Sequence, residues 1–385
     1  MGLWGAAVVA RGPLAAFAAM GLMWGTFAAV LPDLKAMLGV DEATLGLLLL
    51  LTPIAGVAAM LVAPAFGAAL GRAALPLSAL AMALAFALPG QAAVPVLFAA
   101  AMMACGAATG LTDVLMNARV AALENARGLH LMTLCHAAYS FGYAGGALAT
   151  GALRQAGWGP GWVMATMASG AVVLALAVAE RDGRIDGLAR PPRGGPGLGL
   201  VPVLGGGIVL IAFLTEHAAE AWSALHIEQT LGGSPAQGAM GPAALALTMG
   251  VARLVGQRFA DRLDPLRLMA GGAVLSAMGA LVAAMAVSPA MAQLGFVIMG
   301  IGSSVIAPTA FSLVGRHALP QARARAVARA TLIGYFGYFF GPPTLGFVAG
   351  AFGLRAAFVL AGALLLCVLV LAPALVQRGR SAARA

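Results

Sequence analysis

Three acidic side chains lie inside stretches of sequence that are otherwise apolar and long enough to cross a bilayer. Asp113 falls in the predicted span 94–117, and Glu216 and Glu220 fall in the predicted span 200–226. A carboxylate at the centre of an isolated membrane helix costs at least about 2.5 kcal/mol, so such a group normally faces a wet cavity and has a function. Carboxylates in this setting can bind a cation or take up and release a proton.

His136, in the predicted span 131–153, is a second kind of titratable group inside the membrane. With a rise of 1.5 Å per residue, Asp113 and His136 are each expected about 9 Å from the cytoplasmic interface, on consecutive antiparallel helices. This predicts a carboxylate–imidazole pair, which can bind and release a proton near physiological pH. Asp113, His136 and Glu216 are therefore the predicted proton-coupling residues. The alternative is that Asp113 only staples helices together and that His136 is a packed, hydrogen-bonded histidine.

Aromatic and polar side chains in the same spans are candidates for binding a solute, because rings stack on rings and hydroxyls form hydrogen bonds. The predicted substrate-binding residues are Trp24, Asn117, Tyr139, Tyr143, Glu220, Tyr335 and Tyr338. Each aromatic residue, taken singly, also fits a packing role. Tyr143 and Tyr338 are expected to meet across the interface between the two halves. No arginine is expected near the middle of a span, which favours a neutral or cationic small solute over a phosphorylated one.

The sequence does not support metal binding, ATP-driven pumping or enzymatic catalysis. Glu216-His217-x-x-Glu220 places metal-ligand types within one helical turn, but it does not match H-E-x-x-H and no second cluster completes a site. No G-x-x-x-x-G-K-[ST] motif indicates ATP-driven pumping, and no paired intramembrane aspartates or serine elbow indicate an enzyme. We expect neither a metal nor a cofactor.

The composition is that of a membrane protein. Hydrophobic residues make up 62% of the chain and charged residues only 9%, and the mean hydropathy is +0.96. A soluble domain carries roughly a quarter charged residues, so this chain could not solvate itself as a globule. About 20 apolar residues cross the hydrocarbon layer as a helix. The predicted spans are 13–34, 43–70, 74–92, 94–117, 131–153, 161–180, 200–226, 241–260, 266–287, 290–314, 327–350 and 354–376.

The placement of the 22 basic residues predicts the orientation. With both termini in the cytoplasm, all but Lys35, Arg154 and Arg355 fall in or beside cytoplasmic segments, as the positive-inside rule requires. The net charge of +9 therefore reflects topology, and it does not indicate nucleic-acid binding. We expect a multi-pass protein of the bacterial inner membrane.

The sequence contains an internal repeat. The pattern F-G-Y-x-x-G-x-x-x-x-G that starts at Phe141 recurs from Phe336. The one long polar interruption on the cytoplasmic side is rich in Pro, Gly and Arg, as flexible linkers are. This predicts a six-helix bundle over 1–180, a cytoplasmic linker over 181–199 and a second six-helix bundle over 200–385. Transporters built from such repeats hold the substrate between the halves, near the midplane.

With these features the chain resembles the major facilitator superfamily over essentially its whole length. The loop from Gly256 to Ala260-Asp261-Arg262 is similar to the loop motif that this family carries after the second helix of each half. The first-half copy, 67–72, lacks the acidic residue. The resemblance implies an all-α major facilitator fold of twelve transmembrane helices in two pseudo-symmetric bundles. It also implies gating roles for Arg253, Asp261 and Arg262, with the second half more important for the cytoplasmic gate than the first.

Within that superfamily the chain resembles the fucose-permease-like branch. The similarity rests on Trp222-Ser223 after Glu216 and on Gly334-Tyr335-x-Gly337 before Gly341-Pro342-Pro343, whereas His217 and Ala221 depart from the branch pattern. It implies a monomeric secondary transporter, proton-coupled, that moves a small polar solute, such as a sugar-like compound, by alternating access. The main alternative is proton-driven efflux of drugs or other lipophilic compounds. Antiporters of the superfamily often carry G-x-x-x-G-P in the fifth helix, and here Ala147 replaces that proline. A sensor that binds without translocating is a further alternative.

Overall fold

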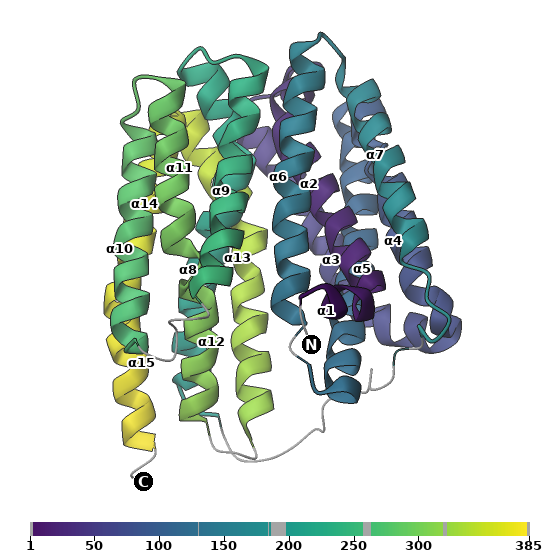
Figure 1. The fold of residues 1–385 in the computed structure, drawn as a ribbon. Helices are drawn as coiled ribbons and strands as arrows, with labels where there is room; N and C mark the ends of the chain where they lie inside the picture. Colours follow the sequence, from purple (N-terminus) through teal and green to yellow (C-terminus); the bar gives the residue numbers. More distant parts are fainter. Residues whose placement is uncertain are drawn as a thin grey trace.

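The computed structural model describes residues 3–129, 131–183, 185, 198–256, 263–318 and 322–382, and all regular elements within them are helices (Figure 1). The α-helices are α1 (Leu3–Val9), α2 (Arg11–Leu38), α3 (Glu42–Leu70), α4 (Ala74–Ala85), α5 (Pro95–Arg127), α6 (Met132–Gln155), α7 (Pro160–Ala177), α8 (Val201–Leu225), α9 (Pro235–Gly256), α10 (Pro265–Ala284), α11 (Pro289–Ser303), α12 (Ile306–His317), α13 (Arg323–Phe352), α14 (Leu354–Leu366) and α15 (Val368–Ala382). Two short 3₁₀ turns, η1 (Gly71–Ala73) and η2 (Pro89–Gln91), and a π-helical turn, η3 (His226–Thr230), complete the list.

The twelve predicted spans correspond to these helices, and two of the spans are interrupted. The tenth span is α11 followed by α12, with a break at Ser304 and Val305. Pro308 explains this break, because proline has no N–H to donate to the carbonyl of Ser304 one turn earlier. The twelfth span is α14 followed by α15. By contrast, Pro342 and Pro343 lie within the continuous helix α13.

Nine helical segments of the described chain are long and apolar enough to cross a membrane, and the segment Glu42–Gln91 among them contains both α3 and α4. The remaining predicted spans are α6 and α13, which pack against the opposite half of the molecule. The chain is therefore a multi-pass membrane protein.

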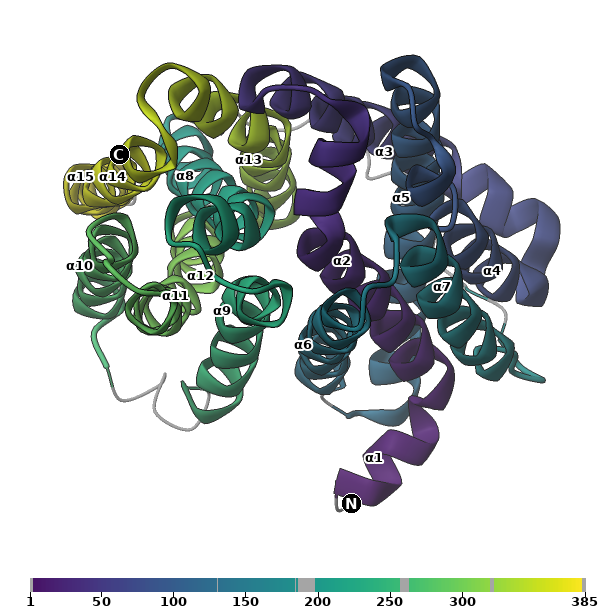
Figure 2. The same cartoon turned by 90° about the horizontal axis from the view of Figure 1, so that it is seen from above.

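The helices form two bundles of equivalent design (Figure 2). Helices α2–α7 make the first and α8–α15 the second. In the first bundle α2 packs on α6, α3 on α5 and α4 on α7. In the second, α8 packs on α13, α9 on α11 and α10 on α14, the same pairs one repeat later. The contacts between bundles are also equivalent, because α6 packs on α9 and α3 packs on α13. The structure thus confirms the predicted pseudo-symmetry, although most of the predicted linker lies outside the described residues.

Glycines let α2 and α6 approach until their backbones touch. A Cβ atom at Gly21 would collide with the carbonyl oxygen of Tyr139, and one at Gly25 would collide with the carbonyl oxygen of Tyr143. Small residues at helix interfaces serve this purpose in membranes, where packing drives association. The close approach also places Tyr143 beside Trp24, which neighbours Gly25 on α2.

We predict that Gly25→Ala lowers the thermal stability of the protein, because the added methyl group forces α2 and α6 apart. Overpacking of this kind costs about 1–3 kcal/mol. Gly145→Ala is the matched control: it lies on α6, and its Cβ would meet nothing within 4 Å. Alanine stabilises a helix by up to about 1 kcal/mol relative to glycine, so Gly145→Ala should keep or raise the midpoint temperature of unfolding. Equal midpoints for the two variants in detergent would contradict the packing account.

Candidate functional site

A small cavity lies between the two bundles, where five helices meet. Its lining includes Trp24 and Phe27 from α2, Tyr143 from α6, and His217 and Glu220 from α8. The cavity measures ≈ 20 Å³, room for about one water molecule. It therefore combines residues of both halves, and it brings together three of the predicted substrate-binding residues.

Ring contacts connect the halves around this cavity. The Trp24 ring meets His217 edge-on with 6.1 Å between centroids, and His217 meets Tyr338 at 5.3 Å. Tyr338 contacts Tyr335 at 5.8 Å, and Tyr139 contacts Tyr143 at 6.0 Å. Tyr143 and Tyr338 share no ring contact in the described part of the chain, and the ring contacts across the interface run through Trp24 and His217.

Asp113 and His136 do not form the predicted pair. The side-chain amide of Asn117 donates to the Asp113 carboxylate at 3.1 Å and to its backbone carbonyl at 2.9 Å. His136 packs edge-on against Phe17 at 5.0 Å. The reason is helix packing: α5 packs chiefly on α3, whereas α6 packs on α2 and α9. Asp113 instead lies within electrostatic range of Tyr335 in the other half.

Glu216 pairs with Arg253. Nη2 of Arg253, on α9, lies 3.6 Å from Oε1 of Glu216. Glu216 lies near the middle of the continuous helical segment Val201–Thr230. The Arg253 guanidinium therefore reaches a carboxylate near the middle of this segment, although Arg253 itself lies in the last turn of α9. The two other predicted gating residues, Asp261 and Arg262, lie outside the described residues.

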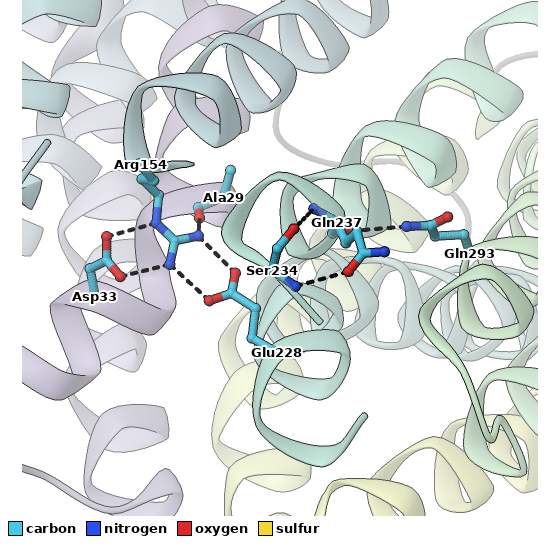
Figure 3. A network of polar contacts seen from close by, with 7 residues as sticks. All are labelled: Ala29, Asp33, Arg154, Glu228, Ser234, Gln237 and Gln293. Carbon is cyan, nitrogen blue, oxygen red and sulfur yellow. Dashed lines mark hydrogen bonds and ion pairs between the residues drawn. The ribbon is translucent and has the colours of Figure 1, made fainter. Parts of the chain in front are cut away.

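A buried arginine in the last turn of α6, at the end of this helix that is uppermost in Figure 1, joins the two halves (Figure 3). The Arg154 side chain is 1% exposed. Its Nε and Nη2 atoms donate to the carboxylate of Asp33 on α2, at 2.7 and 2.6 Å. Its Nη1 and Nη2 atoms donate to the carboxylate of Glu228 in η3, at 2.7 and 2.8 Å, and Nη1 also donates to the carbonyl of Ala29 at 2.6 Å. We call this set the Arg154 clamp.

Other contacts close the same end. Nζ of Lys35, at the end of α2, lies 3.4 Å from Oε1 of Gln229 in the second half. A Cβ at Gly46 of α3 would come within 3.0 Å of the backbone of Pro342 and Pro343 on α13. The two bundles are therefore closed against each other at their upper ends.

The clamp and His217 were missed at the sequence level, for different reasons. From the sequence, Arg154 was recognised only as one of three basic residues that fall outside the predicted cytoplasmic segments. Its partners Asp33 and Glu228 lie 121 and 74 residues away in the chain. Glu228 reaches the arginine from a π-helical turn, a feature that often marks functional sites and that helical periodicity does not reveal. His217 was weighed only as a metal ligand, yet within the described residues no group of three His, Cys, Asp or Glu side chains could hold a metal ion.

Comparisons with known proteins agree with the fold. The Major Facilitator Superfamily model matches residues 204–385. An uncharacterised MFS-type transporter of Yersinia pestis is 33% identical over 92% of each chain, and an uncharacterised transporter of Sinorhizobium fredii is 27% identical over 95% of this chain and 98% of its own. The chain belongs to the major facilitator superfamily of transporters.

Solved structures share the same fold at low sequence identity. A D-xylose–proton symporter superposes with a TM-score of 0.70 at 15% identity, covering 95% of this chain and 97% of its own. The nucleoside transporter NupG superposes with a TM-score of 0.71 at 14% identity, covering 96% and 98%.

We predict that Arg154→Ala destabilises the protein, because it leaves two carboxylates facing each other without their cation. Breaking a buried ion pair by removing one partner costs about 3–5 kcal/mol. Arg267→Ala is the control, since this arginine is exposed at the start of α10. Thermal unfolding of both variants in detergent measures the difference. A midpoint for Arg154→Ala equal to that of Arg267→Ala would show that the clamp does not hold the halves together.

Proposed function

We propose that the protein is a proton-coupled secondary transporter that moves a small polar solute through the space between its halves by alternating access. The observation that carries this proposal is the position of Asp113 and Glu216. Both carboxylates are only partly buried: Glu216 is on α8, which packs on α2 of the first bundle, and Asp113 is on α5, which contributes Met102 to the cavity between the bundles. Carboxylates at such depth are costly unless they serve a proton or substrate pathway.

Alternating access requires a seal that can form at either end of the substrate space. The Arg154 clamp supplies this seal at the upper end. The positive-inside rule assigns the opposite end, with its basic residues and both termini, to the cytoplasm. In this proposal the protein sits in the bacterial inner membrane as a monomer, with bundles 1–180 and 200–385 joined by the segment 181–199. The described conformation is then closed toward the outside.

Proton coupling follows from the Glu216–Arg253 pair. A carboxylate can be neutralised either by a neighbouring guanidinium or by a proton, and the second option releases the guanidinium. Because Glu216 is on α8 and Arg253 on α9, protonation would loosen contacts of the helix that packs on α6 of the first half. Asp113 offers a second carboxylate near the same interface. Asp261 and Arg262 would complete the cytoplasmic gate.

The chemistry of the lining supports a polar solute over a lipophilic one. The lining includes a carboxylate, an imidazole and a phenol beside the aromatic rings. Enclosed sites with a few polar groups among apolar walls fix the orientation of small ligands. Efflux of lipophilic compounds would leave these polar groups without partners, so uptake or exchange of a small polar solute is the better proposal.

We predict that Asp113→Asn and Glu216→Gln each abolish proton-driven solute accumulation, because neither amide can exchange a proton. The measurement uses proteoliposomes that contain a pH-sensitive dye, to which unphosphorylated hexoses, pentoses, polyols and amino sugars are added in turn. Asp41→Asn is the control, since Asp41 caps α3 in an exposed position and asparagine also caps helices. If addition of a solute still changes the internal pH in both variants as it does in the unmodified protein, proton coupling through these carboxylates is wrong.

A further inference from the structure

The cavity between the halves is lined by a carboxylate from one half and by aromatic rings from the other. Glu220 reaches it from α8, while Trp24 and Phe27 of α2 and Tyr143 of α6 form the facing wall. Under the proposed function, in which this space is the substrate site, these residues determine which charge the solute can carry.

Negative charge is in excess around the cavity. The charged groups within electrostatic range of the Tyr139 hydroxyl are the carboxylates of Glu220, Glu216 and Asp113 and the guanidinium of Arg253. Two of these carboxylates, Glu216 and Glu220, lie about one helical turn apart on α8, and the guanidinium beside them is that of Arg253, 3.6 Å from Glu216. In an interior of low dielectric constant such an imbalance is expensive unless protons or a bound cation offset it.

Glu220 is the carboxylate that lines the cavity itself, and it has no permanent cation beside it. Glu216 has Arg253 at 3.6 Å, and Asp113 accepts a hydrogen bond from Asn117. The polar partner of Glu220 is Nδ1 of His217 at 3.6 Å, and an imidazole is a cation only when protonated. The Glu220 side chain is only 13% exposed, so water compensates little of its charge.

The aromatic rings suit a cation as well. A ring face attracts a positive charge within about 6 Å, and the interaction reaches about 2 kcal/mol when the site is desolvated. Trp24 and Tyr143 share the cavity with Glu220. All four tyrosines of the chain lie in this region, and in the described part of the chain no hydrogen bond uses a tyrosine hydroxyl. These hydroxyls are free to bind polar groups on the rest of the solute.

We infer that the solute carries a protonated amine or a quaternary ammonium group. Glu220 is its counter-ion, and the rings of Trp24 and Tyr143 surround the positive charge. A neutral solute would leave the Glu220 charge without compensation, and an anionic solute would add to the excess. Because the carboxylate and the rings come from different halves, binding the cation also draws the two bundles together.

The test uses pairs of compounds that differ in positive charge and little else. The probes are glucosamine against glucose, glucamine against sorbitol, and choline against 3,3-dimethylbutan-1-ol, with sodium chloride as the inorganic cation. Binding to the purified full chain is measured by thermal shift and by tryptophan fluorescence. At least one amine or ammonium compound should bind roughly tenfold to a hundredfold more tightly than its neutral partner, the range for hydrogen bonds to charged groups. Glu220→Gln should remove this preference. Asp264→Asn, at the exposed start of α10, should keep it.

Four results would overturn the inference. The first three are neutral partners that bind as well as the charged compounds, an unchanged preference in Glu220→Gln, and binding of sodium in place of every organic cation. The absence of binding by all three charged probes would also overturn it. These outcomes are separate from failure of the proposed function. Proton-coupled transport of a neutral sugar would contradict the amine inference and support the proposed transport function. Tight amine binding without any translocation in proteoliposomes would support the amine inference and contradict the proposed transport function.

Discussion

The arrangement of the whole molecule depends on one buried arginine that holds a carboxylate from each half. Arg154 binds Asp33 within its own bundle and Glu228 in the other, with both carboxylates engaged through two oxygens. Paired, hydrogen-bonded charges of this kind are tolerated in a buried position, whereas any one of them alone is not. The clamp therefore favours a state in which the upper ends of the bundles are in contact, and it determines which residues face each other in the centre.

Below the clamp, the same closure creates the site. Glycine contacts between α2 and α6 hold Trp24 and Tyr143 side by side, and α8 brings His217 and Glu220 against them. Further along α8, Glu216 meets Arg253 of α9. The Arg154 clamp, the rings that line the cavity and the Glu216–Arg253 ion pair thus follow one another along the interface. This order is what a carrier needs if occupancy of the centre is to decide which end is open.

The fold could be predicted from the sequence because a bilayer imposes a strong rule on helix length and hydropathy, and because the repeated F-G-Y pattern revealed the duplication. The lining of the cavity was predicted in part: Trp24, Tyr143 and Glu220 were chosen for their chemistry and the structure brings them together. Contacts between helices were harder to predict. The expected Asp113–His136 pair assumed that neighbouring spans pack together, but α5 and α6 pack chiefly on other helices. The role of Arg154 could not be predicted, because its partners are distant in the sequence and one of them lies in a π-helical turn. Neither feature produces a local sequence pattern.

The central claim is that the two bundles rock against each other, so that the two ends open in alternation. Double electron–electron resonance between pairs of spin labels can measure the distance between the bundles at each end of the protein in nanodiscs. One label pair at exposed Gln155 and Val287 reports the upper end, and another at exposed Arg127 and Arg316 reports the lower end. When Glu228→Gln weakens the clamp, the account predicts a longer upper distance together with a shorter lower distance. Distances that stay unchanged, or that lengthen at both ends together, would contradict alternating access through this interface.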